Sequence, residues 1–345
     1  MGRVVSGAIA VGVAAVAFIA TGPAEAQSFY AGKTVTIIVS TGGDDSYGYI
    51  ARAFAQHMPK YIPGQPTMIV KAMPGAGNVL ATNHLYNIAP KDGTTIGTIN
   101  NAIPLHQVLD GRGVHYDASK FNWLGSTGTY NSVAYVWQSA GIKTIQDVMS
   151  KEVILGGTGA GSSIVIYPTV MNNVLGTKFK IVLGYKSVSE INIAMERGEV
   201  QARTGSYADL QSEHQDWLDQ KKVVLLTQIG SKPDKAIPSD VPLVVDLAKT
   251  DEQRQILKLI ASPIGLGRPY LAPPDVDTDR VALLRKAFRE TMADKGFLGD
   301  MAKLKIDVDP VSGDDIAQIV NETVNASPEI VAKAKAAMGE GASSQ

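Results

Sequence analysis

Residues 35–46 read VTIIVSTGGDDS and set the architecture expected for the whole chain. The first five residues form an apolar, β-branched run, which is typical of a strand covered on both faces. A glycine-rich turn, residues 41–46, follows this run. Ile50, Phe54 and Met58 then recur at helical spacing. A strand, a tight turn and a helix in this order predict a β-α unit of an α/β protein.

Two further glycine-rich turns stand in the same position relative to their neighbours. Residues 74–78 (PGAGN) and residues 156–163 (GGTGAGSS) each follow a β-like run and precede a helical pattern. The first backbone N–H groups of a helix are unpaired and lie at the positive end of its dipole, so they favour an anion. Glycine lets the backbone approach that anion closely. Such turns are also plain connectors, but three of them together favour anion binding.

The strand and helix order occurs twice along the chain, which predicts two sheets. The first run ends with a strand at 95–99, and the second begins after about residue 130. Helices predicted beyond Pro263 are expected to return to the first sheet. We therefore predict domain 1 from residues 27–126 and 262–345, domain 2 from residues 127–261, and a ligand cleft between them.

The N-terminus is typical of a secretory signal, and we expect residues 1–26 to be a cleavable signal peptide. Arg3 precedes an apolar run, and Ala24-Glu25-Ala26 fits a cleavage site. The 345-residue chain has no cysteine and a formal net charge of −1. The missing cysteine excludes disulfides and thiolate metal sites, and the charge gives no sign of nucleic-acid binding. We expect an exported protein, located in the periplasm.

Catalytic and cofactor motifs are absent from the sequence. It has no Gly-x-Ser-x-Gly elbow, no His-Glu-x-x-His and no phosphate loop ending in Gly-Lys-Ser/Thr. The five histidines have no ligand spacing, and a calcium-like loop at 275–279 lacks the required glycine and glutamate. We therefore expect no enzyme, no cofactor and no metal, but a receptor that binds a small carboxylate. The alternative from another class is an exported hydrolase of esters or glycosides, for which Asp44, Asp45 and Glu190 are the candidate acids.

Two aspartates in the first turn admit two interpretations. Asp44 and Asp45 either cap the helix expected to begin near Tyr49, or meet a donor group on the ligand. The second interpretation leads to another alternative, an amino-acid receptor of the same fold in which one of these carboxylates meets the amine. Tyr47, Tyr49 and Tyr185 offer hydroxyls and flat apolar area for a ligand body, although each is equally suited to core packing.

Arg203 is predicted at the end of a strand that reaches the cleft. Its guanidinium would pair either with a distal carboxylate of the ligand or with an internal acid such as Glu190 or Glu199. The sequence leaves both possibilities open.

At these turns the chain resembles the solute-binding receptors of tripartite tricarboxylate transporters, also called Bug receptors. The resemblance covers nearly the whole mature chain and rests on residues 29–33 (FYAGK), 49–52 (YIAR), 73–78 (MPGAGN), 89–94 (APKDGT), 157–162 (GTGAGS), 184–185 (GY) and 190–200 (EINIAMERGEV). It implies an α/β, two-domain periplasmic-binding-protein (flytrap) fold, each domain having a mainly parallel sheet flanked by helices. It also implies a monomeric receptor that closes over a di-/tricarboxylate or aromatic acid. The receptor would deliver this ligand to a membrane permease with a large and a small subunit.

In this family the turn after the first strand and the glycine turn of the second domain hold the ligand carboxylate through backbone N–H groups, hydroxyls and water. The turn at 74–78 would support or line the cleft. Together with the side chains weighed above, the predicted ligand-binding set is Gly42, Gly43, Asp44, Asp45, Ser46, Tyr47, Gly75, Ala76, Gly77, Asn78, Thr158, Gly159, Ala160, Gly161, Ser162, Ser163, Tyr185 and Arg203.

The chain departs from the family pattern near the expected cleft. Gly48 stands where relatives often have an aspartate, and Gln201 where they commonly have another. Ser187 and Val188 replace a usual glycine pair. These differences make the identity of the ligand less certain than its carboxylate class.

Overall fold

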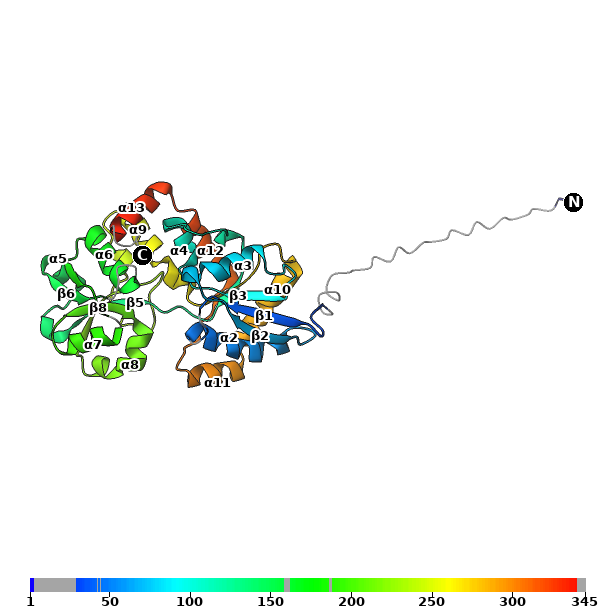
Figure 1. Cartoon of the computed structure of the whole chain (residues 1–345), viewed down its shortest axis with the longest axis horizontal. Helices are drawn as coiled ribbons and strands as arrows, with labels where there is room; N and C mark the ends of the chain where they lie inside the picture. The colour runs from blue at the N-terminus through cyan, green and yellow to red at the C-terminus, as the bar shows by residue number, and fades with distance from the viewer. Residues whose placement is uncertain (3–28, 42, 44, 158–161, 186–187, 340–345) are drawn as a thin grey trace.

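The computed structural model describes residues 1–2, 29–41, 43, 45–157, 162–185 and 188–339. They form two lobes side by side, each built on one β-sheet with helices on both faces (Figure 1). The α/β class and the two-sheet organisation are thus confirmed. The predicted signal peptide falls almost wholly outside the described residues. None of the described helices has the length and apolar composition needed to cross a bilayer.

The first lobe contains a six-stranded mixed sheet. Its strand order is β11 (Val311–Ser312), β4 (Asn122–Ser126), β10 (Pro269–Ala272), β3 (Thr95–Thr98), β1 (Thr34–Val39) and β2 (Thr67–Ala72). The strand β1 pairs in parallel with β2 and β3, whereas β10 is antiparallel to β3 and β4. Most strands therefore point the same way. The segments that follow β1 and β2 leave the sheet at the same end, the carboxyl ends of these parallel strands.

The second lobe contains a five-stranded mixed sheet of similar design. Its strand order is β7 (Phe179–Val182), β6 (Val153–Gly156), β8 (Ala202–Ser206), β5 (Ser132–Trp137) and β9 (Val223–Ile229). The strand β6 is parallel to β7 and β8, and β5 is antiparallel to β8 and β9. The pairing of Ser132 with Ser206 places two hydroxyls next to each other at the end of β8.

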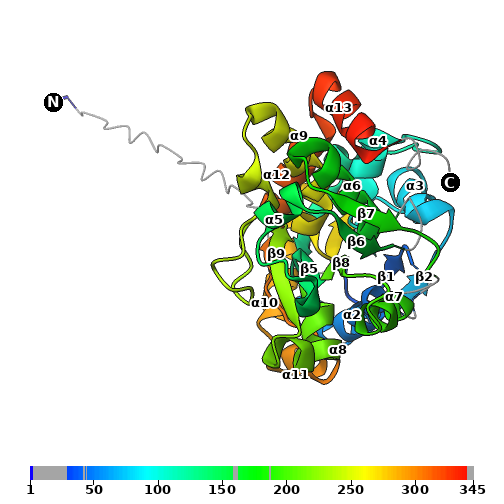
Figure 2. The same ribbon diagram turned by 90° about the vertical axis from the view of Figure 1, so that its left-hand side faces the viewer.

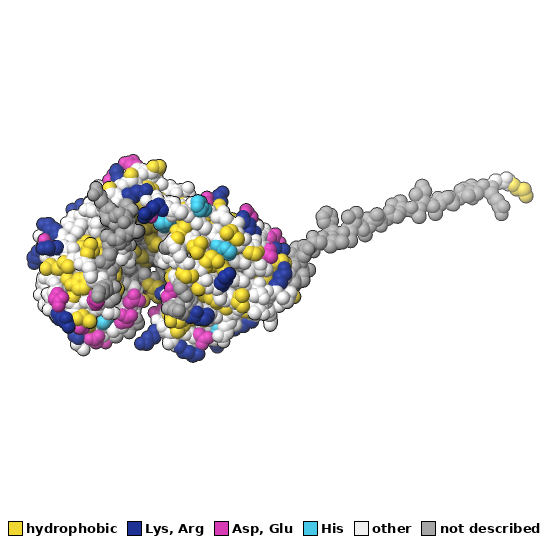
Figure 3. Space-filling view, in the orientation of Figure 1, with side chains coloured by type: hydrophobic (Ala, Val, Ile, Leu, Met, Phe, Trp, Pro, Cys, Tyr) yellow, Lys and Arg dark blue, Asp and Glu magenta, His cyan; other side chains and the backbone are white. Residues whose placement is uncertain are grey.

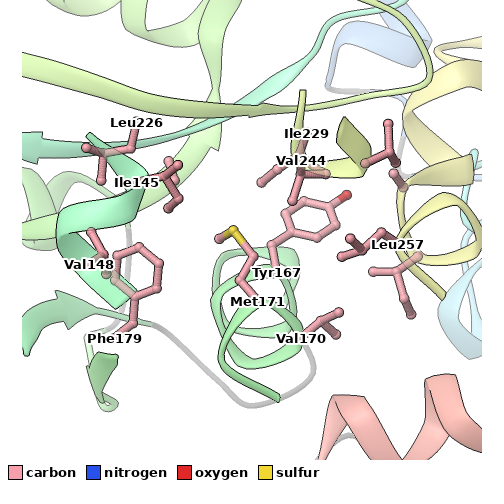
Figure 4. Close-up of a cluster of buried hydrophobic side chains, with 14 of the residues drawn as sticks. Ile145, Val148, Tyr167, Val170, Met171, Phe179, Leu226, Ile229, Val244 and Leu257 are labelled. Atoms are coloured by element: carbon pink, nitrogen blue, oxygen red, sulfur yellow. The ribbon is translucent and has the colours of Figure 1, made fainter. Parts of the chain in front are cut away.

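Helices cover both faces of each sheet and enclose four apolar clusters. Sheet one is covered by α2 (Ser46–His57), α3 (Val79–Asn87), α4 (Ile103–Leu109), α10 (Thr278–Met292), α11 (Lys295–Lys303) and α12 (Gly313–Val324). Sheet two is covered by α5 (Ile145–Ser150), α6 (Ser163–Leu175), α7 (Val188–Glu196), α8 (Tyr207–Asp219) and α9 (Asp251–Leu266). Figure 4 shows Tyr167, Met171 and Leu257 within the largest of these clusters.

The last helix, α13 (Pro328–Met338), packs away from the first sheet. It lies against α4, α6 and α9 (Figure 1, Figure 2), and its Ile330 and Ala334 are buried in the same cluster as the core of the second lobe. The prediction grouped this helix with domain 1. The domain boundaries themselves stay a prediction. The four helices α4, α6, α9 and α13, which come from distant parts of the chain, meet above the space between the lobes.

One partly buried carboxylate joins the end of α2 to the start of α11. Asp294 caps α11 by accepting a hydrogen bond from the Phe297 amide at 2.9 Å. It also accepts hydrogen bonds from Lys60 Nζ at 2.6 Å and the Tyr61 hydroxyl at 2.9 Å, and its Oδ1 lies 3.2 Å from His57 Nδ1. The Lys60 ammonium, followed by the amide and hydroxyl donors, holds the pKa of this carboxyl well below its usual range.

Replacing Asp294 with alanine should lower the free energy of unfolding at pH 7 by about 1–2 kcal/mol, as expected for a lost helix cap that also leaves the Tyr61 hydroxyl and His57 without this acceptor. Because the carboxyl has the lower pKa in the folded state, its contribution is present above about pH 4 and is lost as the pH falls below that value. Urea unfolding at pH 7 and pH 3 measures both effects. Asp240→Ala, at an exposed position, is the control; a difference from wild type that is the same at both pH values would contradict the prediction.

Candidate functional site

The cleft between the lobes contains two connected chambers, which we call upper and lower. The upper chamber, about 470 Å³, is lined mainly by α4, α6 and α9. The lower chamber, about 700 Å³, is lined by the start of α2, by α8 and by residues 304–307. Figure 3 shows the hollow between the lobes. Tyr130, Ser206 and Arg268 line both chambers and therefore mark the boundary between them.

The Arg268 guanidinium is the positive charge at this boundary. Its Nε donates to Ser46 Oγ at 2.9 Å, and its Cζ lies 4.8 Å from the centre of the Tyr130 ring. Its Nη1 is buried, and no described residue accepts a hydrogen bond from it. None of the ion pairs found among the described residues involves Arg268. The Asp209 carboxylate attracts this charge, although none of these ion pairs joins the two. The side chain thus brings a cation with a spare donor to the cleft, which suits a carboxylate.

Two chain crossings between the lobes hold Arg268 in place. Gly267 ends α9 with φ 57° and ψ −118°, a conformation that favours glycine. A Cβ atom at Gly267 would lie 1.8 Å from the carbonyl oxygen of Gly128 on the other crossing. The backbone N–H of Arg268 donates to Ser126 Oγ at 2.9 Å. The position of Arg268 therefore depends on direct contact between two segments far apart in the sequence.

Tyr47 closes the same corner from the first lobe. Its hydroxyl donates to the Gly267 carbonyl at 3.3 Å and accepts a hydrogen bond from the Asn101 amide at 3.3 Å. Burial raises the pKa of Tyr47 to about 12, so the hydroxyl stays protonated near neutral pH. Tyr47 lines the upper chamber, and its predicted contact with a ligand stays a prediction.

In the first turn Asp45 is a helix cap, which confirms one of the two interpretations. Its carboxylate accepts hydrogen bonds from the Gly48 amide at 3.1 Å and the Thr41 hydroxyl at 3.0 Å. A Cβ at Gly48 would lie 1.9 Å from the Gly43 carbonyl oxygen, so the fold leaves no room for a side chain there. The close approach of the Gly43 carbonyl therefore requires glycine at position 48 in this conformation.

The turn at 74–78 is connected by hydrogen bonds to Asn100, which lines the upper chamber. Asn78 adopts a left-handed conformation with φ 75°, and its side-chain oxygen accepts a hydrogen bond from Ser40 Oγ at 3.2 Å. Ser40 Oγ in turn accepts a hydrogen bond from the Asn100 amide at 3.0 Å. Gly75, Ala76, Gly77 and Asn78 are not among the residues that line either chamber.

The second lobe contributes hydroxyls to the cleft. Ser163, the first residue of α6, lines the upper chamber, and Ser206 lines both chambers. Ser162 precedes α6 at its N-cap position. Tyr185 packs against the cluster under α7 and α8, and lines neither chamber. Of the predicted residues that the structure describes, Ser46, Tyr47 and Ser163 line the chambers.

Arg203 is placed differently from the prediction. The strand β8 continues three residues beyond it to Ser206, and its side chain is only 2% exposed. The guanidinium lies over Gly205, where a Cβ would come within 2.6 Å of Nη2, and its Cζ is 5.4 Å from the Tyr135 ring centre. Its Nε and Nη1 have no acceptor among the described residues. A direct contact between Arg203 and the ligand stays a prediction.

Several predicted residues lie outside the described part of the chain, and their roles also stay predictions: Gly42, Asp44, Thr158, Gly159, Ala160 and Gly161.

The lower chamber carries most of the negative charge of the cleft. Asp209, Glu213 and Asp307 line it together with Lys305. Burial, followed by the nearby Glu213 carboxylate, raises the pKa of Asp209 above its usual range. Among the described residues, no group of three or more His, Asp or Glu side chains is arranged to hold a metal ion.

Sequence reasoning missed the central residues of the boundary, Tyr130, Ser206 and Arg268. Arg268 follows a glycine after a helix, which is a common connector and gives no sign of a site. Both Tyr130 and Arg268 belong to segments that cross between the lobes, and their neighbourhood arises only when the crossings touch.

Comparisons with known proteins agree with this architecture. Residues 50–335 match the family model described as the tripartite tricarboxylate transporter family receptor. The UPF0065 protein in gbd 5'region of Cupriavidus necator is 26% identical over 321 residues, which covers 90% of each chain. A TctC solute-binding protein from Polaromonas, solved without ligand, superposes with a TM-score of 0.69 at 14% identity, covering 89% of this chain and 98% of that one. A protein of R. palustris solved with adipate superposes with a TM-score of 0.57 at 18% identity, covering 88% and 97%.

Proposed function

Because the chain belongs to the tripartite tricarboxylate transporter receptor family, we propose that it captures a small organic carboxylate in its cleft and delivers it to a tripartite membrane permease. Receptors of this family are periplasmic solute-binding proteins rather than enzymes. For this chain we propose the same location and the same absence of catalysis. The proposed role of the cleft is therefore to bind the ligand, enclose it and release it unchanged.

The observation that carries the proposal is the Arg268 guanidinium at the boundary of the two chambers. Its positive charge has no ion-pair partner among the described residues, and Ser46, Tyr130 and Ser206 lie around it or line the same space. The hydrogen bond to Ser46 holds the guanidinium in place, and its buried Nη1 lacks an acceptor among the described residues. A charged donor held in this way gains most from an anionic partner. The fold shared with a protein solved with adipate is consistent with a carboxylate but shows only the architecture.

Closure of the lobes would follow from the distribution of donors. Ser46 and Tyr47 belong to the first lobe, whereas Ser163 and Ser206 belong to the second. A ligand shifts the equilibrium toward the closed form only if it contacts both lobes there. A carboxylate held at Arg268 would border both chambers, whose walls include hydroxyls of the two lobes, and would thereby meet this condition.

The proposal is tested by a thermal-shift screen of carboxylates, followed by calorimetry. Carboxylates should raise the unfolding midpoint, with micromolar dissociation constants (about −8 kcal/mol) for the best of them. Small-angle scattering should show a smaller radius of gyration with the bound ligand. The matched control is the amide of each acid, which has the same size without the charge, and should give no shift. The proposal would be contradicted if none of the acids raised the unfolding midpoint, or if the protein hydrolysed simple esters.

A further inference from the structure

The upper chamber has an uneven chemical lining. Arg268 is the only charged residue among the described residues that line it. The rest of its wall is largely apolar and includes Leu105, Leu109, Ile166, Ile260, Ile264 and Met338. These side chains come from α4, α6, α9 and α13, the four helices that meet above the cleft (Figure 1). One cation at the edge of an apolar space suits a ligand with one charged end and an apolar remainder.

Several polar groups that line the chamber are fixed at or beside Arg268, and others, such as Asn100, Asn101 and Ser163, belong to its wall. The Tyr47 hydroxyl donates a hydrogen bond to the carbonyl of Gly267, the residue before Arg268. The Tyr130 ring faces the Arg268 guanidinium. Ser132 and Ser206 are paired across β5 and β8. Ile260 and Ile264, in contrast, are 4% and 7% exposed and belong to an apolar core. A second ionised group that reached these side chains would lose its hydration without gaining a partner.

The lower chamber is equally unsuited to a second carboxylate. Its described lining residues include three carboxylates, Asp209, Glu213 and Asp307, against two cations, Lys305 and the Arg268 guanidinium, and the proposed anchor role already engages Arg268. Burial, followed by the neighbouring Glu213 carboxylate, raises the pKa of Asp209 although Arg203 and Arg268 act to lower it, in keeping with this excess of acids. A dicarboxylate anchored at Arg268 would therefore place its other end either among apolar side chains or among like charges.

We infer that the ligand is a monocarboxylate with an apolar body, held by its carboxylate at Arg268 and inserting its body into the upper chamber. The inference rests on the proposed carboxylate-binding function and narrows it to one class, aliphatic or aryl-alkyl monocarboxylates. The chamber volume of about 470 Å³ lies within the range of small-molecule pockets and leaves room for a body of several carbon atoms.

The experiment compares ligands that share six carbon atoms, using calorimetry on the full-length mature protein. Hexanoate should bind at least about tenfold more tightly than adipate, which carries a second carboxylate, and more tightly than norleucine, which adds an α-ammonium. In the series from propionate to hexanoate, affinity should rise about fourfold per methylene, the value expected for burial of each CH₂ group.

A variant tests the location of the body. Leu105→Gln keeps the approximate size of a chamber side chain but makes it polar, and should lower the hexanoate-to-propionate affinity ratio at least about fivefold. Leu298→Gln, on α11 and outside both chambers, is the matched control and should leave the ratio unchanged. Because the ratio compares two ligands on one variant, a partial loss of folded protein does not alter it.

The possible outcomes separate the two proposals. Tighter binding of adipate or norleucine than of hexanoate would overturn the monocarboxylate class while leaving a carboxylate receptor intact. An unchanged ratio in Leu105→Gln would overturn the placement of the body in the upper chamber. Failure of every acid to bind would overturn the proposed function itself.

Discussion

Arg268→Gln should reduce affinity for the bound carboxylate by about 100-fold, or about 2.7 kcal/mol, because charged hydrogen bonds are lost together with the one charged side chain among the described residues that line the upper chamber. The unliganded protein should remain as stable as wild type or gain stability. This follows because the Arg268 Nη1 is buried without an acceptor among the described residues. Calorimetry measures the affinity, and urea unfolding without ligand measures the stability.

Two further variants make this prediction specific. Arg268→Lys keeps the charge but loses the planar fork, so affinity should fall by an intermediate amount, about tenfold. Arg289→Gln removes an exposed arginine from α10 and should leave binding unchanged. If Arg268→Gln retained wild-type affinity, or lost affinity only in proportion to lost stability, the anchoring role of Arg268 would be wrong.

Gly267→Ala should destabilise the protein by about 3 kcal/mol or more, because it combines a strained backbone with a clash between the two crossings. Its Cβ would lie 1.8 Å from the Gly128 carbonyl oxygen and 2.9 Å from Ser126 Oγ. Neither neighbour is the flexible end of a long side chain, so one crossing must move. This movement would also displace Arg268, and ligand affinity should fall together with stability.

The control for this variant is Gly299→Ala, within α11. Nothing lies within 4 Å of a Cβ at Gly299, and alanine is the better helix former, so stability should stay the same or rise slightly. Thermal and urea unfolding with and without ligand measure both variants. A Gly267→Ala protein with wild-type stability would show that the crossings are free to separate, contrary to the contact described above.

Local sequence patterns predicted much of the fold. The strands β1, β2 and β3 and the helix α2 were predicted near their observed positions because apolar periodicity is a local property. The cap at Asp45 was also predictable, since a short polar side chain before a helix has a local partner, the Gly48 amide. The strands β4 and β10 were not predicted. Each is short, includes glycine or proline, and is held by antiparallel pairing with strands from distant parts of the chain.

The candidate site also has one part that local sequence patterns predicted and another part that depends on contacts between distant segments. The sequence by itself determined the α/β class, the glycine-rich turns and the presence of Ser46, Tyr47 and Ser163 at the ends of strands or starts of helices, because these follow from near neighbours in the chain. Only the tertiary structure decided that Arg268 and Tyr130 share one corner and that four helices form an apolar chamber beside them. Such a constellation depends on how distant segments cross and pack, and no local pattern encodes the distance between two crossings.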